Sequence, residues 1–234
     1  MAPEISIVIP VYNEERILEA AVTELLERLS PLGWRFEIIL AENGSKDSTP
    51  QLAEALVAQF PEVRTLSVGE PNYGLALRRG IQAARGELVL CDEIDLCDTE
   101  FHQAAVELLR QGEAELVIGS KLIAGAADER PFTRHAASIA YTTLLRLLLG
   151  FRGTDTHGLK AFRRAALIDL VDACVVDKDV FASELVIRAY RAERQVVEIP
   201  VQLSEKRPPS IHLWRRVPGV LKSVAKLTYA IRLR

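Results

Sequence analysis

Four carboxylates lie within seven residues in the segment GELVLCDEIDLCD, which runs from Gly86 to Asp98. Asp92, Glu93, Asp95 and Asp98 follow an apolar run that reads as a buried strand. Like charges this close repel and raise one another's pKa, so a cation among them is expected unless they are spread over a solvated turn. Carboxylate oxygens suit Mg²⁺ or Mn²⁺. The segment therefore indicates a divalent metal site, with a solvated turn and a helix cap at Thr99 as the alternative.

Two further polar loops follow apolar runs, PVYNEE after Ile5–Ile9 and AENGSKDS after Phe36–Leu40. Short apolar runs alternate with segments of helical periodicity, which predicts a mostly parallel sheet covered by helices. We expect strands at 5–9, 36–40, 63–68, 88–91 and 114–118, and helices at 14–29, 47–60, 75–84 and 99–110. Pro10 is expected to stop the first strand. The carboxyl ends of such strands share one edge, where ligands bind.

The chain lacks the glycine-rich phosphate loops of common nucleotide-binding folds. No GxGxxG follows the first predicted strand, and no GxxxxGK[ST] occurs. A site with many carboxylates and few glycines fits a nucleoside diphosphate that is held through a divalent metal.

The distribution of charge divides the chain in two. Of 234 residues, 49% are hydrophobic and 26% charged, which is ordinary for a soluble globular protein. Residues 206–234 contain eight Lys or Arg and no acid, whereas residues 1–205 hold 21 basic and 32 acidic residues. We therefore expect a domain at 1–205 and a basic tail at 206–234 with an anionic partner. Nothing in this pattern predicts a nucleic-acid partner.

The sequence favours a cytoplasmic location. Cys91, Cys97 and Cys174 are an odd number without metal-type spacing, so reduced thiols are expected. No signal peptide is recognisable at the N-terminus. The most apolar segment, His135–Phe151, is interrupted by Arg146, so no run reaches the ~18 residues of a membrane span.

The tail is predicted to form a basic amphipathic helix from about Leu213, with Pro218 near its regular start. Trp214, Val217, Leu221, Val224, Thr228 and Ile231 share one arc of the helix, and Arg215, Lys222 and Lys226 the opposite one. Such a helix is typical of peripheral attachment to an anionic membrane, here the inner face. Packing on the body of the protein and a homodimer contact are the alternatives.

Several motifs in order resemble one known family. SIVIPVYNEE, AENGSKDST and GELVLCDEIDL, followed by DTHGLKAFRR and VFASELVIRA, resemble the family-2 glycosyltransferases of the GT-A fold. Within them the chain is most similar to the dolichyl- or polyprenyl-phosphate mannose or glucose synthase branch, from about Ile5 to Val201. The resemblance implies a single Rossmann-like α/β domain whose mostly parallel central sheet is flanked by helices. In that branch, segment 135–150 matches a helix on the membrane surface; a buried helix is the alternative.

The resemblance also implies a nucleotide and metal site. Glu93 and Asp95 match the metal-binding acidic pair, with Mg or Mn as cofactor, although Glu93 is one methylene longer than the usual Asp and Asp92 competes for its role. A carboxylate at Glu42 suits the N–H of uracil or guanine equally, so UDP- and GDP-sugars remain as donors. The implied nucleotide-binding residues are Pro10, Tyr12, Glu14, Glu42, Asn43, Asp92 and Glu93.

Basic residues of the chain match positions that bind phosphate in this branch. Arg78 and Arg79 are further candidates for phosphate binding. For each of these basic residues, the alternative is that it is an ordinary surface charge. His157 could bind the diphosphate or the sugar, and the alternative is that it only stabilises its loop. The implied acceptor-binding or phosphate-binding residues are Lys121, Arg134, His157, Arg163 and Arg207. The implied catalytic residues are Asp95, Arg134, Lys160 and Glu184.

The implied reaction is inverting transfer of a hexosyl group from a UDP- or GDP-sugar to polyprenyl phosphate. An acceptor phosphate is already ionised and needs cations around it. A soluble hydroxyl acceptor would instead need a carboxylate base, for which Glu184 or Asp177 is the candidate. A sugar-nucleotide-binding protein without turnover is the third hypothesis, motivated by Glu93.

Overall fold

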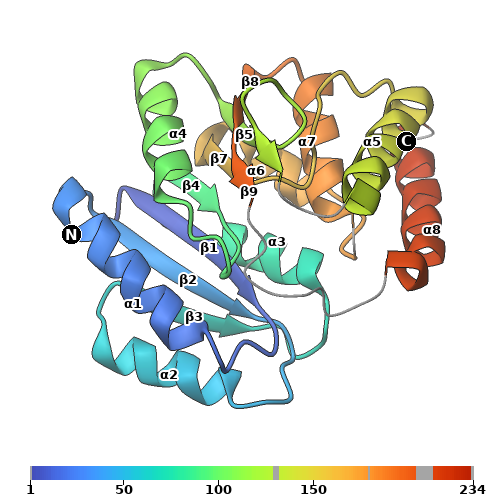
Figure 1. Cartoon of the computed structure of the whole chain (residues 1–234). Helices are drawn as coiled ribbons and strands as arrows, with labels where there is room; N and C mark the ends of the chain where they lie inside the picture. Colours follow the sequence, from blue (N-terminus) through green and yellow to red (C-terminus); the bar gives the residue numbers. More distant parts are fainter. Residues whose placement is uncertain (1, 129–131, 179, 204–212, 233–234) are drawn as a thin grey trace.

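Alternating side chains of the central strands fill two hydrophobic cores, one on each face of a sheet. In β1 (Ile5–Val11), Ile5, Ile7 and Ile9 pack into one core and Val8 into the other. This is the two-residue period of a strand buried on both faces. The structure is a computed structural model that describes residues 2–128, 132–178, 180–203 and 213–232, and its helices cover both faces of the sheet (Figure 1).

The other elements follow the predicted alternation of strands and helices. The remaining strands are β2 (Phe36–Glu42), β3 (Val63–Ser67), β4 (Leu88–Cys91), β5 (Leu116–Ser120), β6 (Ala127–Asp128), β7 (Lys160–Arg163), β8 (Val196–Pro200) and β9 (Gln202–Leu203). The helices are α1 (Leu18–Leu29), the 3-10 turn η1 (Ser30–Leu32), α2 (Thr49–Gln59), α3 (Tyr73–Ala83), α4 (Thr99–Gln111), α5 (Phe132–Leu149), α6 (Arg164–Ala173), α7 (Phe181–Arg191) and α8 (Leu213–Arg232).

Seven strands form the main sheet in the order β3-β2-β1-β4-β7-β5-β8, and β6 pairs with β9 separately. Neighbours in the main sheet are parallel except where β7 pairs with β4 and β5. The predicted mostly parallel sheet is thus confirmed. Helices α1, α2 and α4 contribute to one core, and α3 and α5 to α8 contribute to the other.

The prediction that Pro10 stops the first strand is wrong, because β1 continues to Val11. Pairing with β4 ends at Val8, whereas pairing with β2 continues to Val11. At Pro10 the strand therefore has a neighbour on one side only, which is where a residue without an N–H is tolerated.

Strand β7 was not predicted, and it changes which residues meet at the ligand-binding edge. It is antiparallel, with Lys160 opposite Cys91 at the end of β4 and Arg163 opposite Leu88 at its start. The approach before β7 is tight, since a Cβ on Gly158 would lie 1.8 Å from the carbonyl oxygen of Gly119. A glycine is therefore needed there.

The tail helix α8 packs on the body of the protein beside α5 (Figure 1). Val224 and Leu227 are buried in the second core, and Arg191 of α7 donates to the carbonyl oxygen of Ile231 at 2.9 Å. Pro218 lies inside α8 and not at its start, near enough to the N-terminus that few backbone hydrogen bonds are lost. The predicted domain boundary at 205/206 lies outside the described residues.

Candidate active site

Four strands bring polar residues to one edge of the sheet, three of them as the sequence predicts and β5 in addition. The carboxyl ends of β1, β2, β4 and β5 lead to Tyr12, Asn43, Asp92 and Lys121 respectively. Because β7 runs in the opposite direction, its first residue, Lys160, joins them. The edge thus gathers acidic and basic groups from distant parts of the chain.

The loop between β4 and α4 folds as a short turn. The carbonyl oxygen of Glu93 accepts hydrogen bonds from the N–H groups of Leu96 (2.9 Å) and Cys97 (3.1 Å). At its far end, Asp98 caps α4 by accepting two N–H groups of the first helical turn at 3.1 and 2.9 Å. The predicted cap is therefore present, and Glu93 and Asp95 lie between the strand and the cap, both half-buried.

Asp92 points into the protein and away from this edge. Its side chain is 0% exposed, and Oδ2 lies 2.6 Å from Nε2 of His102 on α4. This is a close electrostatic contact that falls outside the in-line geometry of a hydrogen bond, and neither atom has another hydrogen-bond partner among the described residues. Oδ1 accepts the N–H of Glu93 at 2.7 Å. This geometry does not support the predicted nucleotide-binding role of Asp92 or its competition with Glu93 for metal, because the carboxylate faces His102 and not the edge.

The charges around Glu93 show the electrostatic crowding that the sequence predicts. Burial, and then the negative charges of Asp95 and Asp92, raise the pKa of Glu93 from 4.5 to about 7, while Lys121 and Lys160 oppose this rise. A bound cation would relieve the same repulsion.

The pair Glu93 and Asp95 fits a hard divalent cation. Within the described parts of the chain, no three His, Cys, Asp or Glu side chains converge as a metal cluster. A cation that takes only two protein carboxylates needs further oxygen ligands, which a diphosphate supplies. The donor set therefore suits a metal that binds together with a nucleoside diphosphate.

Lys160 is a buried cation beside the acidic loop. It is 3% exposed, and Nζ donates to the carbonyl oxygen of Gly158 at 2.5 Å. Burial lowers the pKa of Lys160, while negative neighbours that include Asp155 and Glu93 oppose this. A lysine that is buried beside carboxylates is available to attract an incoming phosphate.

Lys121 reaches the same region from the end of β5. Nζ donates to Oδ2 of Asp155 at 2.7 Å, and both side chains are less than one-tenth exposed. Oδ1 of Asp155 accepts the backbone N–H of His157 at 2.9 Å. Burial would raise the pKa of Asp155, but the charge and hydrogen bond of Lys121 and the contacts of His157 hold it below its usual range. Asp155 thus links the two predicted phosphate-binding residues.

A chain of hydroxyl groups supports the exposed imidazole of His157. Its Nδ1 lies 3.3 Å from Oγ1 of Thr156, which lies 2.8 Å from Oγ of Ser183. Ser183 in turn lies 2.9 Å from the hydroxyl of Tyr141, whose ring is edge-on to the imidazole with centroids 5.0 Å apart. The orientation of His157 is thereby set by helices α5 and α7.

The predicted nucleotide loops after β1 and β2 are tied to each other. Asn13, with φ of 56°, accepts the N–H of Lys46 through Oδ1 at 2.8 Å, and its own N–H donates to Oγ of Ser45 at 3.0 Å. Glu14 is 7% exposed, and its N–H donates to Oγ1 of Thr49 at 2.7 Å. These contacts give the two loops one fixed arrangement.

Glu42 is held by hydrogen bonds within this arrangement. Its carboxylate accepts the N–H of Ser45 (2.5 Å) and the hydroxyl of Ser67 (2.6 Å). Burial would raise the pKa of Glu42, but these hydrogen bonds hold it below its usual range. Asn43 is buried and its Oδ1 accepts the N–H of Asn72 at 2.5 Å. Among the predicted nucleotide-binding residues, Pro10 is buried and Tyr12 is 37% exposed at the edge.

Tyr73 joins the site although the sequence reasoning did not select it. Asn72 caps α3 by accepting the N–H of Leu75 at 3.1 Å, and Tyr73 directly follows the cap, with 42% of its surface exposed. Burial of the hydroxyl, and then the negative charge of Glu93, raise the pKa of Tyr73. The available signal was a capping residue after the third strand, which places the start of α3 at the ligand-binding edge.

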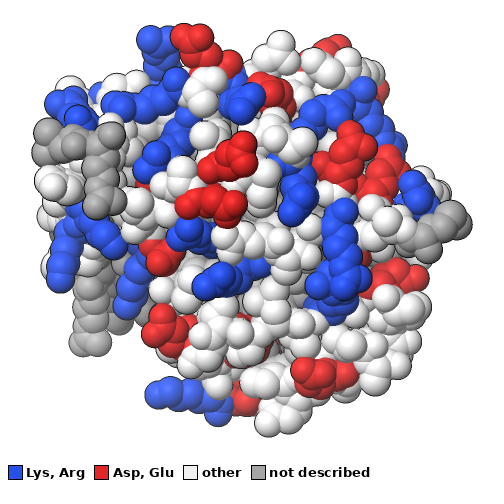
Figure 2. Space-filling view, turned by 180° about the vertical axis from the view of Figure 1, so that it is seen from behind, with Lys and Arg blue, Asp and Glu red and all other residues white. Residues whose placement is uncertain are grey.

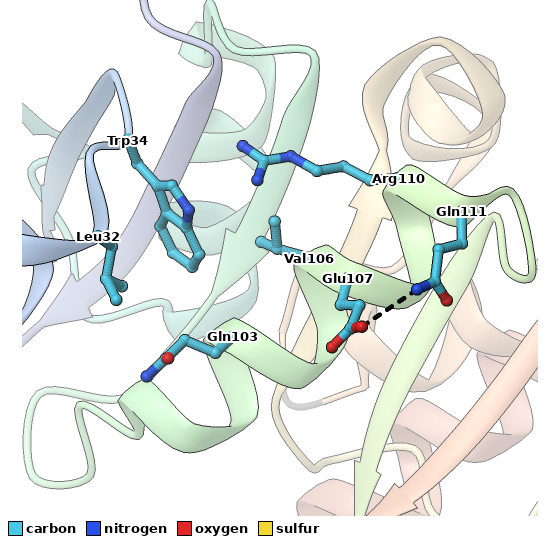
Figure 3. Close-up of a pocket in the computed structure, with 7 residues that line it drawn as sticks. All are labelled: Leu32, Trp34, Gln103, Val106, Glu107, Arg110 and Gln111. Atoms are coloured by element: carbon cyan, nitrogen blue, oxygen red, sulfur yellow. Dashed lines mark hydrogen bonds between the residues drawn. The ribbon is translucent and has the colours of Figure 1, made fainter.

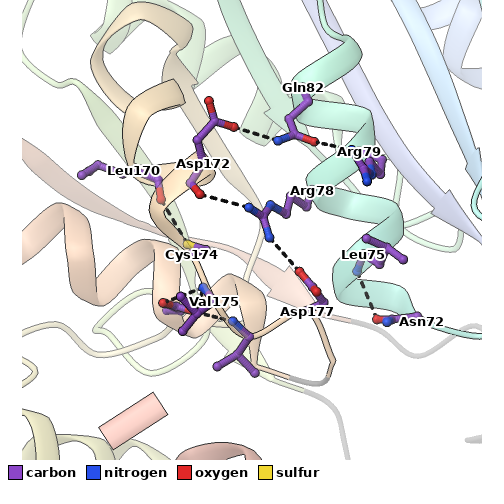
Figure 4. Close-up of polar contacts among 12 residues, drawn as sticks. Asn72, Leu75, Arg78, Arg79, Gln82, Leu170, Asp172, Cys174, Val175 and Asp177 are labelled. Atoms are coloured by element: carbon purple, nitrogen blue, oxygen red, sulfur yellow. Dashed lines mark hydrogen bonds and ion pairs between the residues drawn. The ribbon is translucent and has the colours of Figure 1, made fainter. Parts of the chain in front are cut away.

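Arg78 has a structural role. It donates to Oδ1 of Asp177 at 2.9 Å and to the carbonyl oxygen of Asp172 at 3.0 Å, which joins α3 to the segment after α6 (Figure 4). Arg79 contacts Gln82 at 3.4 Å (Figure 4). Asp177 is therefore already paired with a cation, which makes it a poor candidate for a catalytic base.

Arg163 lies at the opposite edge of the sheet, and its predicted phosphate-binding role is corrected. It is paired with Glu87 at 2.9 Å and also donates to the carbonyl oxygen of Leu109. Because β7 is antiparallel, its two ends face opposite edges, and only Lys160 reaches the site.

Glu184 is buried and fully engaged, and its predicted catalytic role is corrected. It is 0% exposed and accepts the N–H groups of Val175 and Val176 at 2.8 to 3.0 Å. Arg188, one turn later in α7, donates to the same carboxylate at 2.7 Å. Glu184 therefore anchors the segment before α7. Arg207, and the side chain of Arg134, lie outside what the structure describes.

A surface hollow of about 370 Å³ lies away from these residues. Its wall includes Trp34, Val106 and Arg110 from the region of η1 and α4 (Figure 3). Arg110 pairs with Glu4, just before β1, at 2.7 Å. The hollow therefore lies toward the amino ends of the parallel strands, where ligands of this architecture do not normally bind.

A comparison with protein families shows which family the chain belongs to. The model of "Glycosyl transferase family 2" matches residues 6–171, which include the acidic loop and Lys160. The chain belongs to glycosyl transferase family 2. The resemblance seen in the motifs is confirmed.

Curated relatives of this family-2 chain include a glycosyltransferase and an enzyme named for a dolichyl-phosphate acceptor. Glycosyltransferase AglD of Haloferax volcanii is 33% identical over 237 residues, covering 99% of this chain and 38% of that protein. Dolichyl-phosphate beta-glucosyltransferase ALG5A of Trichomonas vaginalis is 29% identical over 216 residues, covering 86% of this chain and 66% of that protein. The chain thus spans less than two-thirds of the length of either relative.

Solved structures share the fold. Glucosyl-3-phosphoglycerate synthase from Mycobacterium tuberculosis in complex with uridine diphosphate has a TM-score of 0.71 and 23% identity, covering 98% of this chain and 80% of that one. A complex of that enzyme with Mn²⁺, uridine diphosphate and glucosyl-3-phosphoglycerate has a TM-score of 0.70 and 21% identity, covering 97% and 80%. The family-2 chain therefore has the predicted GT-A fold.

Proposed function

We propose that this chain transfers a hexosyl group, with inversion, from a UDP- or GDP-sugar to polyprenyl phosphate. The observation that carries the proposal is the meeting of two half-buried carboxylates, Glu93 and Asp95, with two buried lysines, Lys121 and Lys160, at the carboxyl edge of the sheet. The carboxylates suit a metal-bound diphosphate, and the lysines suit a second anion. The match to AglD supports glycosyl transfer, and the match to ALG5A, which is named for dolichyl phosphate, supports the acceptor.

Glu93 and Asp95 would hold Mg²⁺ or Mn²⁺ together with the diphosphate of the donor. When bound, such a cation neutralises the charge that develops on the departing nucleoside diphosphate. Tyr12, Glu42 and Asn43 border the space for the nucleoside. Attack of the acceptor oxygen on the sugar C1, opposite the departing diphosphate, gives inversion.

The acceptor side of the site contains cations, and the two carboxylates considered as a base are both occupied by other partners. Lys121 and His157, joined through Asp155, would orient the acceptor phosphate, and Lys160 would attract it toward the donor. A phosphate is already ionised and attacks without a base. A hydroxyl acceptor would require one, and Glu184 is sealed while Asp177 is ion-paired.

Attachment to a membrane would bring the chain to such an acceptor. The predicted apolar arc of α8 is partly used in packing, since Val224 is buried, but Leu221 and Tyr229 are 52% and 61% exposed. On the neighbouring α5, Ile139 and Leu147 are 48% and 75% exposed. Neither helix contains an acidic residue. Among the described residues, no helix is both long enough and apolar enough to span a membrane. We propose that the chain attaches peripherally through the exposed apolar side chains of α5 and α8, on the inner, cytoplasmic face of the membrane.

A transfer assay tests the proposal. The protein is incubated with radiolabelled UDP- or GDP-sugars, Mn²⁺ and polyprenyl phosphate, and the label is followed into the organic phase. We expect organic-phase label that depends on the cation and on Asp95, with Asp95→Asn as the inactive control. Label only in a water-soluble product would indicate a hydroxyl acceptor, and nucleotide binding without transfer would show that the chain is a binding protein; either contradicts the proposal.

A further inference from the structure

A buried histidine lies directly behind the acidic loop. His102 is 0% exposed, on the face of α4 that places Phe101, Ala105 and Val106 in the first core. Such a face normally carries apolar side chains, and a buried polar ring requires a partner. The close neighbour of its Nε2 is Oδ2 of Asp92, at 2.6 Å.

Asp92 connects this imidazole to the backbone of the loop. Its Oδ1 accepts the N–H of Glu93 at 2.7 Å, and its own N–H donates to the carbonyl oxygen of Val8 in β1 at 3.0 Å. The peptide group that precedes Asp92 is therefore held by the sheet, and the N–H of the next peptide group, at Glu93, is held by the Asp92 carboxylate. The other oxygen of that carboxylate lies against His102.

The same helix holds the loop at its other end. Asp98 caps α4 through two backbone N–H groups, and the turn between is closed at the carbonyl oxygen of Glu93. Glu93 and Asp95 thus lie on a short span whose two ends are fixed to α4. Two carboxylates that must converge on one cation repel each other, so a loose span would let them separate.

We propose that His102 is a positioning residue that, through Asp92, holds Glu93 and Asp95 in the geometry that binds a divalent cation with a nucleoside diphosphate. The inference rests on the proposed metal-dependent function. His102 touches no substrate, and its effect reaches the site only through the loop. Groups that orient metal ligands typically contribute about 10- to 100-fold to metal affinity.

The test measures binding in the absence of turnover. Mn²⁺ affinity in the presence of UDP is determined by electron paramagnetic resonance of free Mn²⁺, and UDP affinity without metal by calorimetry. We expect His102→Leu to weaken Mn²⁺ binding about 10-fold and to leave metal-free UDP binding unchanged. His102→Gln, which keeps a polar N–H group on this face of α4, is expected to restore most of the affinity.

Val106→Ala is the matched control, because Val106 is equally buried one turn later on α4. We expect Val106→Ala to lower the melting temperature of the protein and to leave its Mn²⁺ affinity unchanged. Unchanged Mn²⁺ affinity in His102→Leu, or an equal loss in Val106→Ala, would overturn the inference. If His102→Leu does not fold, Asp92→Asn replaces it with the same expected loss, and wild-type affinity in that variant overturns the inference. Failure of the wild-type protein to bind Mn²⁺ with UDP would instead contradict the proposed function.

Discussion

The acidic side chains near the ligand-binding edge differ in what surrounds them. Asp92 and Glu184 have 0% exposed side chains and partners inside the protein. Glu93 and Asp95 are half-buried at the edge, and burial with the nearby charges raises the pKa of Glu93 to about 7. The first pair maintains structure, and the second pair is suited to a ligand that brings positive charge.

Replacing Asp95 by Asn removes one negative oxygen from the proposed metal site. We expect kcat/KM for sugar transfer to fall by about 100-fold or more, as when one electrostatic stabiliser of a transition state is lost. Turnover measured over a range of Mn²⁺ concentrations checks this. Unchanged cation-dependent turnover would show that Asp95 is not a metal ligand.

Replacing Glu184 by Gln tests its reassignment from catalysis to structure. The change weakens its hydrogen bonds to two backbone N–H groups and leaves Arg188 without its charge partner. We expect the free energy of unfolding to fall by about 2–4 kcal/mol, with kcat of the folded protein nearly unchanged. Urea denaturation and the transfer assay measure the two effects; a large loss of kcat at unchanged stability would restore the catalytic role.

At the scale of elements, one antiparallel strand determines the composition of the site. By pairing between β4 and β5, β7 brings Lys160 beside the acidic loop and carries Arg163 to the opposite edge. At that opposite edge, Glu37 of β2 joins three neighbouring segments. It accepts the hydroxyl of Ser6 (2.7 Å), the N–H of Arg85 (2.8 Å) and the guanidinium of Arg64 (2.5 Å).

The Glu37 cluster predicts a pH dependence of stability. Burial would raise the pKa of Glu37, but the hydrogen bonds from Ser6, Arg85 and Arg64 lower it below 4.5. A carboxyl with a lower pKa in the folded state stabilises the protein above its unfolded-state pKa, and this contribution is lost as pH falls through the folded-state value.

Thermal melts between about pH 3 and 7 of the wild type and Glu37→Gln check this prediction. We expect the variant to be less stable at pH 7 by about 1–3 kcal/mol and its Tm to fall less steeply toward low pH. Glu54→Gln, at an exposed position of α2, is the control and should follow the wild type. Parallel curves for wild type and Glu37→Gln would contradict the assignment.

At the scale of the whole molecule, positively charged side chains gather on the side of α5 and α8. From behind, Lys and Arg side chains gather along the margin where α8 lies, whereas the central surface mixes both signs (Figure 2). The exposed positions of α8 include Leu221, Lys222, Lys226 and Tyr229. An acid-free surface with exposed apolar side chains suits anionic lipid.

Reversing the charge of two lysines of α8 tests whether this surface binds anionic lipid. We expect Lys222→Glu/Lys226→Glu to reduce binding to vesicles that contain phosphatidylserine by about 10-fold or more, since each Lys near such a surface contributes about 1 kcal/mol. Vesicle sedimentation measures the binding. Arg28→Glu/Arg35→Glu, an equal charge change near α1 and η1, should bind like the wild type, and equal losses in both would contradict a specific membrane face.

The sequence by itself determined the class of fold, the strand ends that supply polar loops, and the acidic loop with its cap at Asp98. These are local properties, because strand period, helix caps and the placement of loops at strand ends depend on neighbouring residues. Only the tertiary structure decided that Asp92 faces His102, that Glu184 is sealed, and that Lys160 reaches the site while Arg163 does not. The positions of Lys160 and Arg163 depend on pairing between segments far apart in the chain, the antiparallel insertion of β7, for which no local pattern carries a signal. The directions in which Asp92 and Glu184 point depend on how each packs against a neighbouring helix or loop, which a hydrophobic pattern does not specify.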